Sequence, residues 1–309
     1  MRGVCCSNSR KELVNNAAKL RLLFLLTIAL VTSPLRAAEP PADVEFTRDV
    51  VYGKGGDVDL KLNIARPKDA KGPLPLVLFI HGGGWVAGDR SGHDPQTWDF
   101  AKRGYVAATI GYRLTDVAKW PAQVNDVKCA VRFLRANASR YGIDPDHIGA
   151  VGFSAGAHLA MMLAVTDKSD GLEGDDGSPE QSSAIQAAVS FFGPTDLARD
   201  DLPAAGHPLV EKLVGHLPEK GNKACENASP LYYVSKGDAP MLLFQGMADP
   251  LVPYNQATIM AEAMAKAQIP GRVELIMNAG HGWNGPELTR CVDATVAFLE
   301  IHLKAPKKQ

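Results

Sequence analysis

A serine, an aspartate and a histidine stand beside glycines at three separate places in this chain of 309 residues. Ser154 is the centre of a Gly-x-Ser-x-Gly pattern, Asp249 follows Gly-Met-Ala, and His281 stands between two glycines. A histidine can take the proton from a serine hydroxyl, and a carboxylate can hold that histidine in the required tautomer. The three residues, in this chain order, predict nucleophilic catalysis by Ser154.

The pattern around Ser154 is typical of a sharp turn between a strand and a helix. A short apolar run at 147–152 precedes it, and a helix-forming run at 157–164 follows. Gly152 and Gly156 carry no side chains, so the strand and the helix can approach closely and expose the serine hydroxyl. The alternative is a glycine-rich turn that carries an ordinary serine.

A second glycine-rich stretch, His-Gly-Gly-Gly-Trp, begins directly after an apolar run at 74–80. Backbone N–H groups in such a loop are not covered by side chains. We expect those of Gly83 and Gly84, together with that of Ala155, to form an oxyanion hole. The alternative is a glycine-rich turn without this role.

Two tryptophans stand next to these stretches: Trp85 follows the glycine loop, and Trp283 follows the histidine loop. Both are predicted to bind substrate by stacking on a ring. The alternative is that they pack the wall of the pocket.

Alternating apolar segments predict the elements that position these residues. Strands are expected at 44–52, 58–64, 74–80, 105–110, 147–152, 185–192, 241–245 and 273–277, and helices at 121–137, 157–164, 254–267 and 286–303. The first two strands form a hairpin. Strands that alternate with helices predict an α/β fold with a mostly parallel central sheet and helices on both faces. Ligands bind at the carboxyl ends of the strands in such a sheet.

The segment at about 197–238 is too long for a plain connection between two elements. It is polar, with one weak helical stretch at 209–214. We expect a small cap-like insertion beside the site, with a surface excursion of no function as the alternative. Few large apolar side chains are present to shelter a long acyl chain, so small acyl groups are favoured.

The first 38 residues have a different composition from the rest. A positive flank, an apolar run at 22–31 and a small-residue exit predict a signal peptide at 1–38, followed by one domain at 39–309. The expected location is the periplasm or the exterior, without stable membrane association once the signal is cleaved. An uncleaved anchor is the alternative.

Composition narrows the classes of partner. The net charge is −1, so there is no basic surface for nucleic acid. The remaining histidines lack the spacing of metal ligands, and the predicted reaction needs no metal or organic cofactor. Cys129 is expected to be a buried apolar residue. Because export permits disulfides, one hypothesis is that Cys225 and Cys291 pair and tie the insertion to the last helix, and three free thiols are the alternative.

These motifs together resemble a family. His81-Gly-Gly-Gly-Trp85, Gly88-Asp89, Tyr112-Arg113-Leu114 and Gly152-Phe-Ser-Ala-Gly-Ala-His-Leu159 are similar to motifs of α/β-hydrolases in the esterase branch, which includes the hormone-sensitive-lipase-like esterases. The similarity is greatest to bacterial bifunctional acetylxylan/feruloyl esterases. It implies the α/β-hydrolase fold and a secreted carboxylic ester hydrolase for acetyl or feruloyl-type esters, with a small-molecule or carbohydrate ester as substrate.

The resemblance also bears on individual residues. Gly-x-x-Asp-x-x-Val-Pro is the acid loop of that family, which favours Asp249 over Asp196, a competitor at the end of the preceding strand. It implies an ion pair between Arg113 and Asp126 behind the site. His81 is expected to brace the oxyanion loop. Two other functions stay open: an arylformamidase-like amidase, and a non-catalytic binding protein with the hydrolase fold.

Overall fold

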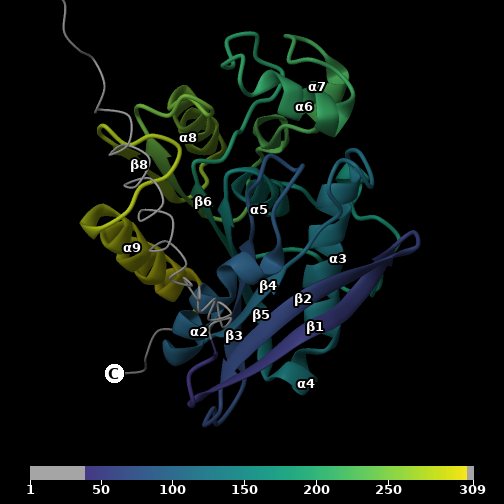
Figure 1. Cartoon of the computed structure of the whole chain (residues 1–309), viewed down its shortest axis with the longest axis vertical. Coiled ribbons are helices and arrows are strands. Elements are labelled where there is room, and N and C mark those ends of the chain that lie inside the picture. Colours follow the sequence, from purple (N-terminus) through teal and green to yellow (C-terminus); the bar gives the residue numbers. More distant parts are fainter. Residues whose placement is uncertain (1–38, 305–309) are drawn as a thin grey trace, which may run out of the picture. The chain divides into compact units, whose positions relative to one another are not determined.

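A central sheet of eight strands organises the part of the chain that the structure describes, residues 39–304 of a computed structural model (Figure 1). The strands are β1 (Val44–Gly55), β2 (Val58–Pro67), β3 (Leu74–Ile80), β4 (Val106–Ile110), β5 (Ile143–Phe153), β6 (Ala187–Phe191), β7 (Met241–Gly246) and β8 (Gly271–Ile276). Their order is β1-β2-β4-β3-β5-β6-β7-β8. Only the β1–β2 and β2–β4 pairs are antiparallel, and the other five pairs are parallel, so the predicted hairpin and mostly parallel sheet are confirmed.

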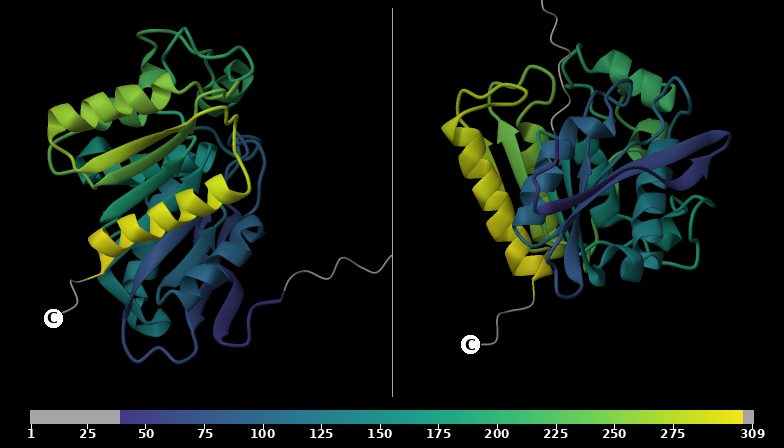
Figure 2. Two further views of the ribbon diagram at one scale, coloured as in Figure 1. Left: turned by 90° about the vertical axis from the view of Figure 1, so that its left-hand side faces the viewer. Right: turned by 60° about the horizontal axis from the view of Figure 1, so that its bottom comes forward.

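Helices cover both faces of this sheet, as predicted. The helices of the described residues are α2 (Asp94–Lys102), α3 (Ala122–Ala136), α4 (Ala138–Tyr141), α5 (Ala155–Val165), α6 (His207–Val214), α7 (Lys223–Asn227), α8 (Asn255–Ala267) and α9 (Pro286–Leu303), with 3-10 turns η1 (Arg90–His93), η2 (Lys168–Asp170) and η3 (Pro230–Tyr233). Side chains of α3, α5 and α8 pack into one apolar cluster, and those of α2 and α9 pack into another. In Figure 2, α9 (yellow) lies on one side of the strands and α3 (teal) lies on the other.

Strand β3 shows how the sheet separates these two clusters. Leu76, Leu78 and Ile80 belong to the cluster of α3 and α5. The residues between them, Val77 and Phe79, belong to the cluster of α2 and α9. Successive side chains of a strand point to opposite faces, so a strand covered on both faces must be apolar throughout. This explains the uninterrupted apolar run of the sequence.

Helix α2 is one of the helices that the sequence pattern missed, and the short helices α4 and α7 are others. Its residues include charged and polar side chains, and the buried apolar ones are Trp98, Phe100 and Ala101. The helix begins with proline in its first turn, which has the backbone angle that a helix start requires. The apolar stripe is too short to give a clear period, although the tertiary packing is sufficient to hold the helix.

The segment between β6 and β7 contains α6, α7 and η3, and it lies beyond the end of the sheet where β6 ends (Figure 1). The helical stretch predicted at 209–214 is longer by two residues, because α6 begins at His207, followed by a proline. Residues 197–238 are called the insertion below.

The hypothesis of a disulfide between Cys225 and Cys291 is wrong, and the alternative of free thiols holds. Cys129, Cys225 and Cys291 are all free and buried in the described part of the chain. Cys225 packs in the cluster that contains α5, whereas Cys291 on α9 packs in the cluster on the opposite face. The sheet separates the two thiols. The prediction that Cys129 is buried is confirmed.

The predicted signal peptide, residues 1–38, lies outside the described residues. Within residues 39–304, no helix has the length and apolar character needed to cross a membrane.

Candidate active site

Ser154 stands at the turn between β5 and α5, in a conformation with φ 52° and ψ −118°. Two close approaches impose the glycines on either side. A Cβ on Gly152 would lie 2.1 Å from the Gly156 oxygen, and a Cβ on Gly156 would lie 2.1 Å from the Ile80 oxygen. Residues other than glycine rarely adopt the backbone angles of Ser154, and such a strained conformation persists only where the surrounding structure enforces it. The turn therefore holds the serine hydroxyl at the head of α5.

The structure brings Ser154, His281 and Asp249 together in one series of hydrogen bonds. The Ser154 hydroxyl lies 2.9 Å from His281 Nε2. On the other side of the ring, His281 Nδ1 lies 2.8 Å from Asp249 Oδ2. A carboxylate only accepts hydrogen bonds, so Nδ1 carries the proton and Nε2 is left to accept the serine proton. This is the tautomer that a general base requires.

Four donors hold the Asp249 carboxylate in a buried position. Besides His281, the backbone N–H groups of Leu251 and Val252 donate to Oδ1, at 2.9 and 3.0 Å. The side-chain amide of Gln245 donates to Oδ2 at 3.1 Å. Gln245 was missed by sequence reasoning. Its one signal was a polar residue at the end of an otherwise apolar strand, four positions before the aspartate.

Asp196, the competing acid, lies in a different set of contacts. Its Oδ1 accepts a hydrogen bond from the Ala198 N–H at 2.9 Å, and its own N–H donates to Gln256 Oε1 at 2.8 Å. Burial raises the pKa of this carboxyl. The Asp196 carboxylate therefore closes a turn after β6, and the carboxylate that is hydrogen-bonded to His281 is that of Asp249.

The glycine loop after β3 lies against Ser154. A Cβ on Gly82 would lie 3.2 Å from the Ser154 Cβ. Gly83 and Gly84 both have positive φ, 107° and 59°. Among residues 39–304, no backbone oxygen accepts a hydrogen bond from the N–H of either glycine. Ala155 begins α5, so its N–H also has no partner within the helix. These three N–H groups suit a developing negative charge on oxygen.

His81 braces this loop in the way the sequence predicted. Its Nδ1 lies 2.8 Å from the Gly82 oxygen, and its ring stacks on Tyr112 with centroids 4.4 Å apart. The Tyr112 hydroxyl donates to the His81 oxygen at 3.0 Å. A Cβ on Gly88 would lie 2.4 Å from His81 Nδ1, which explains the glycine there. Burial lowers the pKa of His81, so it is neutral at physiological pH.

The ion pair implied by the family resemblance is confirmed. The guanidinium of Arg113 donates to both carboxylate oxygens of Asp126, with contacts of 2.6 to 3.1 Å. The backbone N–H of Arg113 also donates to this carboxylate at 2.8 Å. This pair fixes the segment that follows β4 to α3, close to Tyr112.

A small apolar cavity of about 40 Å³ opens beside Ser154. It is lined by Gly84, Trp85, Ser154, Ala155, Pro194, Leu197, Leu202, Gly206, Leu209, Val210, Leu251 and Val252. Four of the aliphatic side chains come from the insertion, which the sequence predicted to be polar and poor in large apolar residues. They are Leu197, Leu202, Leu209 and Val210. They were missed because their place over Ser154 depends on how the insertion folds.

The two tryptophans have different positions. Trp85 is buried and lines the cavity. Trp283 does not line it: its ring packs on Phe191 and Phe192, with centroids 6.3 and 5.5 Å apart, in the cluster on the α9 side. Trp283 therefore packs near the site, which was the alternative to substrate binding, and it does not line the cavity.

Phe192 is a further residue that the sequence did not indicate. It follows β6 with a positive φ of 48°. Its ring lies 4.8 Å from the His281 ring. A phenylalanine is strained in this region of φ, so the packing must hold it there. The Phe192 ring packs against the His281 imidazole and restricts its orientation.

The fold and this group of side chains define a class, the α/β-hydrolases that carry a Ser–His–Asp site. A family model described as BD-FAE matches residues 62–264, and the chain therefore belongs to the BD-FAE family. The resemblance that the motifs predicted is confirmed at this level. In the described part of the chain, no group of three or more His, Cys, Asp or Glu side chains is arranged to hold a metal ion.

Named relatives agree with this class. The chain is 33% identical over 234 residues to a probable carboxylic ester hydrolase, LipM, of Mycobacterium tuberculosis, covering 74% of this chain and 54% of LipM. It is 32% identical to esterase LipQ of the same organism, over 72% of this chain and 53% of LipQ. The chain thus spans about half the length of these curated relatives.

Solved structures give fuller coverage. A truncated carbohydrate esterase from gut microbiota superposes with a TM-score of 0.74 at 26% identity, over 85% of this chain and 99% of that one. Esterase 2 of the planctomycete Thermogutta terrifontis, with propionate bound, superposes with a TM-score of 0.72 at 32% identity, over 86% and 97%. Both of these solved proteins are named as esterases, and this chain is similar to nearly their whole length.

Proposed function

We propose that this protein is a serine esterase that hydrolyses short-acyl esters, acetyl above all, through an acyl-enzyme intermediate. The observation that carries the proposal is the hydrogen-bonded series of Ser154, His281 and Asp249, which opens on a small apolar cavity. The membership of the BD-FAE family supports the reaction class.

The mechanism follows from the donors and acceptors. His281 Nε2 takes the proton of Ser154 as its oxygen attacks the ester carbonyl, and Asp249 stabilises the imidazolium that forms. The oxyanion of the tetrahedral intermediate accepts hydrogen bonds from the backbone N–H groups of Gly83, Gly84 and Ala155. His281 then protonates the leaving alcohol. Water attacks the acyl-enzyme by the same route and releases the acid.

The size of the cavity supports a short acyl group. A volume of about 40 Å³ leaves room for few carbon atoms between Trp85 and the aliphatic side chains of the insertion. Solved structures of the related esterase 2 contain propionate and butyrate, which are short carboxylates. A longer chain would have to displace Leu209 or Leu202 from this wall.

The test compares kcat/KM on p-nitrophenyl acetate, butyrate and octanoate with turnover of N-formylkynurenine. We expect the maximum at two to four carbons. Ser154→Ala should lower turnover by about a million-fold, whereas Ser235→Ala, on the surface, should not change it. A maximum at octanoate would contradict the short-acyl proposal. Preference for N-formylkynurenine would indicate an amidase, and undiminished activity of Ser154→Ala would exclude this site.

The alcohol and the location are further parts of the proposal. We propose a sugar hydroxyl as the alcohol, supported by the likeness to a carbohydrate esterase, with acetylated xylan as the substrate to assay. We also propose export to the periplasm or the exterior, on the signal-peptide pattern of residues 1–38. N-terminal sequencing of the secreted protein would show a start near residue 39, and an intact Met1 would contradict export by cleavage.

A further inference from the structure

His158 is a buried histidine that the proposed mechanism does not use. It lies in α5, one turn after Ser154, and its backbone N–H donates to the Ser154 oxygen at 3.0 Å. Its side chain is fully buried. Burial lowers the pKa of His158 to about 4, so the ring is neutral at physiological pH.

The two partners of this ring determine its tautomer. His158 Nε2 lies 2.6 Å from the backbone oxygen of Ala228, which can only accept a hydrogen bond, so the proton is on Nε2. The indole Nε1 of Trp85 lies 3.3 Å from His158 Nδ1, and an indole N–H can only donate. One neutral imidazole therefore joins the insertion, through Ala228, to the loop that follows β3, through Trp85.

Trp85 has to be held in place, because its backbone is strained. Its φ is 60°, directly after the positive φ values of Gly83 and Gly84. A large side chain is rare in this region, and such a residue stays there only when its surroundings enforce it. The indole is fixed by the hydrogen bond to His158 and by edge-to-face packing on the same ring, at 5.2 Å between centroids.

The orientation of Trp85 bears on the oxyanion donors, since the peptide between Gly84 and Trp85 is part of the same turn. The Trp85 oxygen accepts a hydrogen bond from the Thr115 N–H at 3.0 Å, which anchors the turn at its end. A positive φ is unstrained for glycine but strained for tryptophan, so if the indole moved, the backbone at Trp85 would relax and turn the adjoining Gly84 with it. The Gly84 N–H would then point away from the position of the oxyanion.

We propose that His158 is a positioning residue: its Nδ1, by accepting the indole hydrogen bond, holds Trp85 and thereby the oxyanion donors of Gly83 and Gly84 in register with Ser154. The inference rests on the proposed esterase function and assigns a role within that site. Its second bond, to Ala228, attaches the insertion to α5 and does not align the donors.

Two substitutions separate these bonds. Asn at position 158 places an oxygen near the site of Nδ1 and can accept from Trp85, but it is too short to reach Ala228. Gln at position 158 places its amide N–H₂ near the site of Nε2 and can donate to Ala228, but it leaves the indole N–H without an acceptor. Trp85→Phe breaks the same hydrogen bond at its donor, because it removes the indole N–H and keeps an aromatic ring.

The experiment measures kcat and KM on p-nitrophenyl acetate, with the melting temperature of each variant. We expect His158→Gln and Trp85→Phe to lower kcat by about 10-fold to 100-fold, because the donors lose alignment in both chemical steps. KM of His158→Gln should stay within about threefold, since Trp85 and the other side chains that line the acyl cavity are retained. His158→Asn should keep most of kcat despite a lower melting temperature. The double variant His158→Gln/Trp85→Phe should lose no more than either single one.

The matched control is His147→Gln, which makes the same change in a half-exposed histidine paired with Asp144, and it should behave as wild type. Equal losses of kcat in His158→Asn and His158→Gln, following the fall in melting temperature, would overturn the proposal in favour of a structural role. Wild-type kcat in Trp85→Phe would overturn it as well, even if neither His158 variant folds. Failure of wild-type protein to hydrolyse any ester would instead defeat the proposed function, and this inference with it.

Discussion

The imidazole of His281 is held from several directions. Asp249 accepts its Nδ1–H, Ser154 donates to its Nε2, and Phe192 lies under the ring. Each contact restricts a different motion of the ring, and together they leave one orientation. Gln245 in turn holds the Asp249 carboxylate, so the alignment of His281 also depends on a buried residue that does not line the cavity beside Ser154.

Replacement of the two aspartates tests this assignment. Asp249→Asn keeps the volume of the side chain but can donate to His281, which favours the wrong tautomer. We expect turnover of p-nitrophenyl acetate to fall about 10⁴-fold, as such tautomer errors do in other triads. Asp196→Asn should retain activity within a few-fold, because that carboxyl closes a local turn. Both are measured after circular dichroism has shown a folded protein, and the reverse ranking would assign the acid to Asp196.

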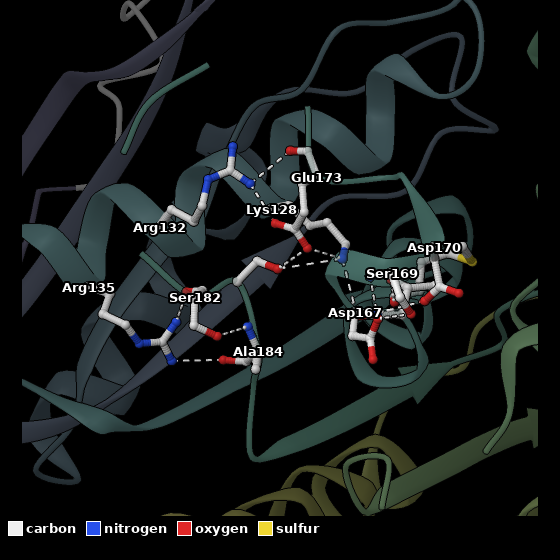
Figure 3. A network of polar contacts seen from close by, with 12 residues as sticks. Lys128, Arg132, Arg135, Asp167, Ser169, Asp170, Glu173, Ser182 and Ala184 are labelled. Atoms are coloured by element: carbon white, nitrogen blue, oxygen red, sulfur yellow. Dashed lines mark hydrogen bonds and ion pairs between the residues drawn. The ribbon is translucent and has the colours of Figure 1, made fainter. Parts of the chain in front are cut away.

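At the scale of elements, α3 presents three basic side chains to one loop. Lys128, Arg132 and Arg135 follow one another at spacings of four and three, so they lie on one face of the helix (Figure 3). Arg135 donates to the backbone oxygens of Ser182 and Ala184. The face therefore binds the loop between α5 and β6 through its main chain.

Lys128 and Arg132 are fully buried and share one carboxylate, that of Glu173 (Figure 3). Lys128 Nζ lies 2.7 Å from Oε1, and Arg132 donates to Oε2 at 2.8 Å. The Ser183 hydroxyl donates to Oε1 at 2.7 Å. Two buried cations thus share a single anion. Loss of the Glu173 charge would destabilise the fold, because both Lys128 and Arg132 would then be buried without a counter-charge.

Glu173→Gln is predicted to destabilise the fold by about 3 kcal/mol at neutral pH, near the lower end for a buried pair because Glu173 is itself partly exposed. The matched control is Glu180→Gln in the same loop, for which no shift in stability is expected. Urea unfolding of both variants measures the difference. A loss below about 0.5 kcal/mol would contradict the dependence on this carboxylate.

The ion pairs of Glu173 with Lys128 and Arg132 also predict that the stability of the fold depends on pH. Burial alone would raise the pKa of the Glu173 carboxyl, but the hydrogen bonds from Lys128 and Ser183 outweigh burial and lower it below its ordinary value. The resulting stabilisation is present above the unfolded pKa of about 4.3 and is lost as pH falls through the folded value. The difference between wild type and Glu173→Gln should therefore shrink as the pH is lowered below about 4.

What the sequence predicted at this scale depended on local signals. The strands were readable because their apolar runs are uninterrupted, and the site loops were readable because glycines follow those runs. Helix α2 has no such period, and the position of Leu209 against Gly84 comes from the folding of the insertion. Gln245 and Phe192 look ordinary in sequence, since their roles exist only once β6, β7 and β8 lie side by side.

For the whole molecule, the parallel register explains why one site forms from distant segments. Ile80 of β3 is opposite Gly152 of β5, and Phe153 is opposite Phe191 of β6. Gly246 of β7 is opposite Ile276 of β8. The strands therefore end along one line, and the loops that carry Gly83 and Gly84, Ser154, Asp249 and His281 all begin there.

The sheet also lies between Cys225 and Cys291, and all three cysteines of the described residues are free and buried, which predicts their redox behaviour. Burial raises the pKa of the Cys129 thiol to about 11 and raises the pKa values of Cys225 and Cys291 too. Buried thiols that remain protonated react slowly with disulfide reagents. The native chain without residues 1–38 should therefore show almost no reactive thiol toward Ellman's reagent at pH 8, and three after denaturation without reductant.

Uncleaved chain should release five thiols on denaturation, because Cys5 and Cys6 remain attached, so the same measurement reports removal of the first segment. The melting temperature should be equal with and without dithiothreitol, since no covalent link constrains the unfolded chain. One thiol from the denatured, cleaved chain, together with a lower melting temperature in reductant, would show a disulfide. A bond between Cys225 and Cys291 would have to join side chains that pack in clusters on opposite faces of the sheet.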